Sequence, residues 1–255
     1  MPQVVECLFC DQRAPRAKEH VFPDWLLRAL HVSHEQLNLT HSSSRGEAIS
    51  KRQHDLHAFR FGHVCKRCNN EWLSRLETEA RRVLASLWRG RRRISRMDSW
   101  VLTLWSLKTA CVLNAASNYR RIVPQDHARS VRAMRPPDGL FVDLSFREIP
   151  YQVSWHQSQQ VRIHAPIRQA RRMEALWHNS GYHIAFGFSN LLLRLVFVPL
   201  PSFRVSPAER CSAGSFCRLW PLRPYIVPRR SRPYHDLSDF VGAAELSPGG
   251  SLTSA

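Results

Sequence analysis

The sequence predicts an α+β protein. We expect a zinc finger of the treble-clef kind at the N-terminal end, a helical middle and a small, mostly antiparallel β region toward the C-terminal side. Three observations lead to this fold class. Two Cys-x-x-Cys pairs bracket residues 7–68, and apolar residues recur at helical spacing after the second pair. From residue 140 onward, apolar and polar residues alternate as they do in half-buried strands.

The two cysteine pairs have the spacing of a tetrahedral metal site. One pair opens the chain and the other closes the first segment, and the four members are Cys7, Cys10, Cys65 and Cys68. Each short-spaced pair holds one side of a Zn²⁺ ion, and four thiolates complete its coordination shell. A full shell leaves no open position for substrate, so the predicted zinc is structural. Cys111, in contrast, lies in an apolar stretch and is expected to be a buried small hydrophobic residue.

The helical middle follows directly. Apolar residues from Trp72 to Trp88 recur at helical spacing, and Gly90 is placed to end that helix. A second helix is expected from Trp100 to about Ser117, capped by Asp98 and Ser99. A short helix is expected after Pro23, over residues 24–30. Residues 13–18 and 31–49 are expected to be loops.

The C-terminal side should contain several strands. The candidates lie at 140–147, 151–156, 161–166, 183–188 and 191–198, and residues 171–178 are expected to form a short helix. The composition of the last twenty residues is typical of a disordered tail. We therefore expect a zinc-finger domain over residues 1–90, a helical and β accessory domain over 91–235, and a tail over 236–255.

The charge of the chain indicates a polyanionic partner. A net charge of +17 over 255 residues, with a pI near 10.7, is unusual, and nucleic acid is the common partner of such proteins. A dense basic run follows the predicted helix and is expected to grip phosphates, although a solvated helix junction would have the same composition. Its members are Arg89, Arg91, Arg92, Arg93 and Arg96.

No feature of the sequence indicates a membrane or secretion. The apolar run from Trp100 to Ser117 is interrupted by Lys108 and falls short of the roughly 20 residues that span a bilayer. The N-terminus has no basic region followed by an apolar run, so no secretory signal is visible. We therefore expect a cytoplasmic protein whose partner is DNA and not a membrane.

The motifs around the cysteine pairs resemble a known family. The order Cys-x-x-Cys, Lys18-Glu-His-Val-Phe-Pro-x-Trp-Leu26, then Cys-x-x-Cys-Asn-Asn-x-Trp72 is similar to that of zinc-containing HNH endonucleases from actinobacterial and phage genomes. The resemblance covers residues 7 to about 80. It implies a ββα-metal nuclease finger that hydrolyses phosphodiester bonds in DNA, with Mg²⁺ or Mn²⁺ as the catalytic ion in addition to the structural zinc.

The resemblance also implies roles for individual residues. His20 matches the general base at the end of the first hairpin strand, and Glu19 matches the acidic metal ligand beside it. Asn69 matches the metal ligand at the start of the helix, with Asn70 as a near alternative. A neutral imidazole suits the role of base because its ordinary pKa lies near neutrality.

The sequence departs from the family in three respects. The acidic residue is Glu in place of the commoner Asp, the helix ligand is Asn in place of His, and the Asn that orients the base is missing. The family has an Asn that orients the base a few residues before the second cysteine pair, where this chain has residues 60–63. His63 either takes the place of that Asn or is a strand residue packed on the hairpin. The departures keep a second function open, that of a catalytically inactive, zinc-stabilised nucleic-acid-binding protein.

Overall fold

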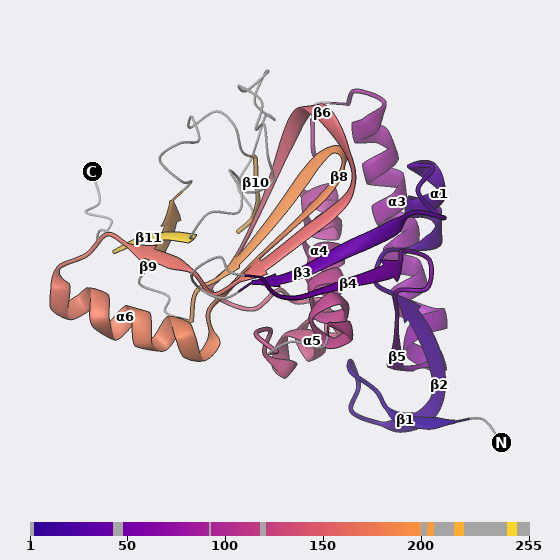
Figure 1. The fold of residues 1–255 in the computed structure, drawn as a ribbon, viewed down its shortest axis with the longest axis horizontal. Coiled ribbons are helices and arrows are strands. Elements are labelled where there is room, and N and C mark those ends of the chain that lie inside the picture. The colour runs from indigo at the N-terminus through magenta and orange to yellow at the C-terminus, as the bar shows by residue number, and fades with distance from the viewer. Residues whose placement is uncertain are drawn as a thin grey trace. The chain divides into compact units, whose positions relative to one another are not determined.

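The computed structural model describes residues 3–42, 48–91, 93–117, 121–199, 203–206, 217–221 and 244–248. The protein is α+β, with several helices and small, mostly antiparallel sheets (Figure 1). It divides into two compact units. Unit 1 comprises Met1–Arg91 and Val101–Pro136, and unit 2 comprises Arg92–Trp100 and Pro137–Ala255. This division differs from the expected boundary at residue 90, because residues 101–136 group with the N-terminal finger.

The first sheet of unit 1 has three strands. They are β1 (Val4–Glu6), β2 (Arg13–His20) and β5 (Arg60–Cys65), in the order β1-β2-β5, and both pairings are antiparallel. The expected loop over residues 13–18 is therefore wrong. Most side chains of β2 are exposed or half-buried, so the strand is defined by backbone pairing on both sides and leaves no apolar pattern in the sequence.

A second, two-stranded sheet joins β2 to β5. It consists of β3 (Gln36–Ser42) and β4 (Ala48–Asp55), which pair antiparallel from Gln36 opposite Asp55. The loop expected over residues 31–49 is thus largely a β ribbon, with residues 43–47 outside the described part of the chain. The polar composition of the two strands concealed their extended backbone.

The helix after the second cysteine pair is confirmed. It begins with α2 (Lys66–Cys68), continues through a π-helical turn (Asn69–Leu73) and ends with α3 (Ser74–Trp88). The apolar residues at helical spacing are its buried face. Gly90 has a φ of 93°, and the Arg91 N–H bonds to the Ser86 carbonyl, so a glycine is needed where the helix ends.

Unit 1 also contains α1 (Asp24–Ala29), α5 (Gln125–Arg132) and most of α4 (Arg96–Ala116). The first residues of α4, up to Trp100, belong to unit 2. Helix α4 begins four residues before the expected Trp100. Ser95 and Asp98 form a reciprocal cap, because Asp98 Oδ2 accepts from the Ser95 N–H and Ser95 Oγ accepts from the Asp98 N–H. Cys111 is buried in α4, as expected. Among the described residues, no helix is long and apolar enough to cross a membrane.

His127 in α5 gives unit 1 a pH-dependent stability. Its side chain is 4 % exposed, and burial lowers its pKa to about 4 against the opposing effect of Asp126. The unfolded chain, with a His pKa of about 6.5, therefore binds a proton that the folded chain does not bind between these values, so stability falls as pH falls. We expect a loss of about 2 kcal/mol between pH 8 and pH 5. Urea denaturation at both pH values, with His127→Gln as the comparison, measures it. An equal loss in the variant would contradict this assignment.

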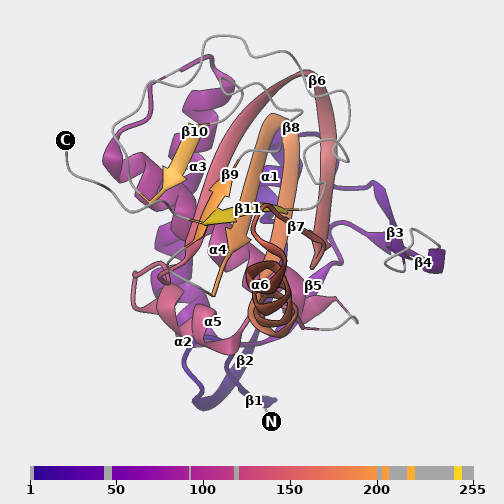
Figure 2. The same cartoon turned by 90° about the vertical axis from the view of Figure 1, so that its left-hand side faces the viewer.

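The main sheet of unit 2 is built on two long strands. They are β6 (Leu140–Ser158) and β8 (Tyr182–Phe197), which pair antiparallel along most of their length, with β10 (Cys217–Trp220) on the other side of β6 (Figure 2). Four of the expected strands are thus halves of β6 and β8. Asp143 of β6 is buried in this sheet. Its carboxylate forms ion pairs with Arg194, at 2.7 Å, and with Arg218.

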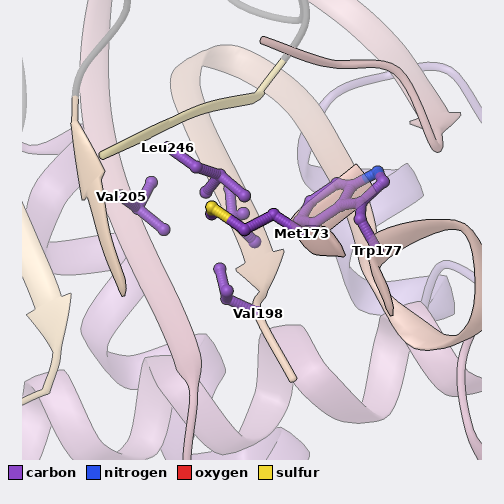
Figure 3. Packing of buried hydrophobic residues seen from close by; sticks show 6 residues of the cluster. Met173, Trp177, Val198, Val205 and Leu246 are labelled. Carbon is purple, nitrogen blue, oxygen red and sulfur yellow. The ribbon is translucent and has the colours of Figure 1, made fainter. Parts of the chain in front are cut away.

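A smaller sheet completes unit 2. Its strands are β7 (Val161–Ile163), β11 (Ala244–Pro248) and β9 (Phe203–Ser206), in the order β7-β11-β9. Helix α6 (Ile167–Ser180) contributes Met173 and Trp177 to a cluster with Val196, Val198, Val205 and Leu246 (Figure 3). The disordered tail expected over 236–255 is therefore wrong at β11, where Leu246 is buried. The rest of that tail lies outside the described residues.

Candidate active site

Four cysteine side chains of unit 1 come together as expected and could hold a metal ion. The Sγ atoms of Cys7, Cys10, Cys65 and Cys68 all lie within 4.8 Å of one another. The first two lie in the turn between β1 and β2, Cys65 ends β5, and Cys68 lies in α2. Four thiolates at these separations suit a tetrahedral Zn²⁺, which the structure of the chain accommodates without a further ligand.

Backbone N–H groups donate hydrogen bonds to two of the four sulfur atoms. The N–H of Cys65 donates to Cys7 Sγ and the N–H of Cys68 donates to Cys65 Sγ, each at 3.4 Å. Hydrogen bonds of this kind stabilise the negative charge of metal-bound sulfur. Helix α5 holds the turn from outside, since Arg129 Nε lies 2.5 Å from Asp11 Oδ2. The hydrogen bond from Arg129 lowers the pKa of Asp11.

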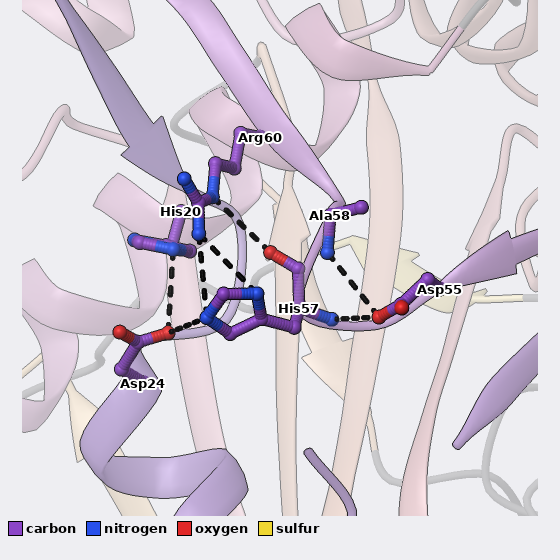
Figure 4. Close-up of polar contacts among 6 residues, drawn as sticks. All are labelled: His20, Asp24, Asp55, His57, Ala58 and Arg60. Atoms are coloured by element: carbon purple, nitrogen blue, oxygen red, sulfur yellow. Dashed lines mark hydrogen bonds and ion pairs between the residues drawn. The ribbon is translucent and has the colours of Figure 1, made fainter. Parts of the chain in front are cut away.

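A second cluster lies where β2 ends. His20 is the last residue of β2, as the resemblance implies, and it lies opposite Arg60 of β5. Its Nε2 is 3.3 Å from Oδ1 of Asp24, the first residue of α1, and His57 Nε2 is 3.3 Å from the same oxygen (Figure 4). One ligand atom from each of His20, Asp24 and His57 lies within 4.8 Å of the others, so this group could also hold a metal ion.

The loop that carries His57 is fixed by its neighbours. Asp55 Oδ1 accepts from the backbone N–H groups of His57, at 2.8 Å, and Ala58, at 3.3 Å. This is the local hydrogen bonding that an Asp favours in a turn. Arg60 Nε donates to the His57 carbonyl at 3.2 Å, and Arg60 Nη2 lies 3.3 Å from both ring nitrogens of His57. A guanidinium therefore flanks the cluster (Figure 4).

Two atoms of this cluster are buried without hydrogen bonds. His20 Nε2 and Asp24 Oδ1 face each other, but the geometry of the contact is not that of a hydrogen bond. Burial lowers the pKa of His20, and the charge of Asp24 opposes that effect. The imidazole is therefore neutral near pH 7, the form that can accept a proton or bind a metal.

Glu19 does not lie in either cluster. Its side chain points to the other face of β2 from His20 and is 8 % exposed. Its carboxylate forms an ion pair with Lys108 of α4, whose Nζ is also 2.6 Å from Glu77 Oε1. Burial alone would lower the pKa of Lys108, but the charges of Glu19 and Glu77 raise it, so the lysine stays protonated. Lys108 therefore holds the Glu19 carboxylate, and the role of Glu19 as a metal ligand stays a prediction.

The other predicted site residues are spread along the helix and beyond it. Asn69 and Asn70 begin the π-helical turn, where Asn69 Nδ2 donates to Asn70 Oδ1 at 3.1 Å and Asn69 Oδ1 is a buried acceptor without a hydrogen bond. Their role as ligands stays a prediction. His63 is an exposed strand residue against Phe61.

The basic run is divided between the two units. Arg89 is exposed, while Arg91 is half-buried with its Nη1 3.4 Å from Ser86 Oγ in unit 1. Arg93 and Arg96 are exposed residues of unit 2. Arg92 lies outside the described residues. The role of these five residues in phosphate binding stays a prediction.

Sequence reasoning missed Asp24, His57 and Arg60. Asp24 could have been found from the sequence. It lies four positions after His20 and directly after Pro23, where a helix was expected to begin close to the histidine. His57 and Arg60 had no such signal, because the loop between β4 and β5 brings them back to His20 only in the folded chain.

The chain matches no protein-family model, no curated protein and no solved structure.

Proposed function

We propose that the protein is a metal-dependent endonuclease of the HNH kind that hydrolyses phosphodiester bonds in DNA. The observation that carries the proposal is the position of His20. It ends a strand of an antiparallel pair that leads, through a cysteine cluster, directly into a helix, and its imidazole faces a carboxylate and a second imidazole. This order of strand, strand and helix around a cysteine site is what the family resemblance implies.

In this proposal His20 is the general base. Burial lowers the pKa of His20, so its neutral imidazole can take the proton of the attacking water. Arg60 is placed beside the same cluster to bind the scissile phosphate. A divalent ion bound here supplies positive charge for the phosphate and for the leaving 3′ oxygen. A zinc in the four-cysteine site is structural.

The net charge of +17 supports DNA as substrate, because a basic protein attracts the phosphate backbone by releasing its counterions. The basic run of Arg89, Arg91, Arg92, Arg93 and Arg96 is the predicted contribution of the helix end and the segment after it.

Incubation with supercoiled plasmid tests the proposed function. We expect nicked and linear DNA to accumulate with Mn²⁺ or Mg²⁺ and the plasmid to stay supercoiled in EDTA. The EDTA reaction must be short enough that the zinc content of the protein does not change. Otherwise unfolding caused by zinc loss could be mistaken for loss of the catalytic ion. Intact plasmid in every metal, from folded protein that binds DNA, would contradict the proposal.

That contradicting result would favour the second candidate, an inactive zinc-stabilised nucleic-acid-binding protein. The ion pair between Glu19 and Lys108 is the observation in its favour, because the acidic ligand that the family uses is not free here. This candidate predicts DNA binding that weakens steeply as salt is added, without any cleavage.

A further inference from the structure

We propose that Asp24 and His57 are the protein ligands of the catalytic divalent ion, and that the site takes Mn²⁺ or a similar transition metal in preference to Mg²⁺. The binding of the ion stands on the geometry alone, and only its part in cleavage rests on the proposed function. The site replaces the one expected at Glu19, which Lys108 occupies.

The separation of the two donor atoms fits one ion. Asp24 Oδ1 and His57 Nε2 are 3.3 Å apart. Carboxylate oxygens and imidazole nitrogens each bind a first-row metal at about 2.0–2.2 Å, so one ion can contact both atoms at an angle close to tetrahedral without moving either backbone. Asp24 Oδ1 is buried and lacks a hydrogen bond, which leaves it free for such an ion.

The two ligands are held by the backbone around them. Asp24 begins α1 directly after Pro23, whose ring fixes the φ of the residue that caps the helix. His57 lies in the turn that the Asp55 carboxylate closes, and the Val21 N–H donates to the Phe59 carbonyl at 3.2 Å, which ties that turn to the end of β2. Ligands fixed in this way lose little entropy on binding an ion.

The surroundings leave room for substrate. The Asp24 and His57 side chains are 36 % and 48 % exposed, so an ion held by these two residues keeps positions open toward solvent. Arg60 Nη2 would leave the His57 ring when an ion binds Nε2, while its Nε can keep the bond to the His57 carbonyl. The freed end of the guanidinium would then face an incoming phosphate beside the ion.

The donor set decides the kind of metal. Mg²⁺ prefers six oxygen ligands in an octahedral arrangement and dehydrates reluctantly. An imidazole with a carboxylate suits Mn²⁺, Co²⁺, Ni²⁺ or Zn²⁺ instead. His20 is 3.3 Å from the same carboxylate oxygen, and we assign it to the proton and not to the ion.

Electron paramagnetic resonance of Mn²⁺ tests this assignment, because free Mn²⁺ gives a six-line signal that disappears when the ion binds. With the four-cysteine site loaded with zinc, we expect one bound Mn²⁺ per chain. Asp24→Asn and His57→Ala should each weaken binding at least about 10-fold, as loss of a metal ligand does, and excess Mg²⁺ should displace Mn²⁺ poorly. His20→Ala should bind Mn²⁺ as the wild type does, and so should His34→Ala, a matched exposed histidine.

Wild-type Mn²⁺ binding by His57→Ala would overturn the assignment, and so would loss of binding in His20→Ala. Equal zinc content and circular dichroism in all variants exclude misfolding as the cause. The nicking assay separates the two proposals. Mn²⁺ bound through Asp24 and His57 without nicking would end the proposed function alone. Metal-dependent nicking that His57→Ala leaves unchanged, with unchanged Mn²⁺ binding, would end this inference alone.

Discussion

Loss of zinc is expected to unfold the finger of unit 1. The three-stranded sheet β1-β2-β5 is short and buries few side chains of β2, so the four-cysteine site is its main cross-link between residues 7 and 68. Binding of structural zinc by small domains contributes on the order of 10–16 kcal/mol, and that free energy is lost with the ion. We expect the purified protein to carry one zinc per chain. A strong chelator should release it together with a loss of ordered structure, followed by circular dichroism.

Cys65→Ser should have the same effect without a chelator. The matched control is Cys111→Ser, because Cys111 is also buried in unit 1 but lies in α4 outside the cluster. We expect zinc content and thermal stability to fall in the first variant and zinc content to stay at one per chain in the second. Equal zinc content in both variants would show that the cysteine cluster does not hold the metal.

Replacement of Lys108 by Ala is the second large effect. It would leave the carboxylates of Glu19 and Glu77 facing each other without their cation, in a site where Glu19 is 6 % exposed. Removing one partner of a buried ion pair costs about 3–5 kcal/mol, because the remaining charge stays buried. We expect the midpoint of urea denaturation to fall accordingly. Because Glu19 precedes His20 in β2, the same change should also loosen the strand end that carries the proposed base.

Two variants control this experiment. Lys66→Ala removes an exposed lysine at the start of α2 and should change stability by less than about 0.5 kcal/mol. The double variant Lys108→Met with Glu19→Gln removes both charges of the closest pair and should recover part of the loss. A Lys108→Ala protein as stable as Lys66→Ala would contradict the structural role of this lysine.

The sequence predicted features that depend on local spacing. The cysteine pairs predicted one four-sulfur cluster, and the helix after Cys65 followed from apolar residues that repeat at helical spacing. The family resemblance implied that His20 ends a strand, and it is the last residue of β2. Each cysteine pair and the helical spacing are encoded within a short stretch of the sequence.

Features that depend on tertiary contacts were not predictable in the same way. Lys108 is 89 positions after Glu19, and only the packing of α4 brings the two charges together. His57 reaches His20 because β3 and β4 form a ribbon. The alternating Leu37 and Leu39 are too short a pattern to reveal its strands in the sequence. The long strands β6 and β8 were interpreted as four short ones, because the apolar pattern is interrupted around residues 147–150 and 189–190.

The central claim is that His20 acts as the base in phosphodiester hydrolysis, and the rate of plasmid nicking by His20→Ala tests it most directly. General base catalysis contributes about 10²–10⁴-fold, so we expect the variant to nick at least about 100-fold more slowly in Mn²⁺ while it retains zinc and bound Mn²⁺. His34→Ala should nick at the wild-type rate. Wild-type nicking by His20→Ala would show that His20 is not the base.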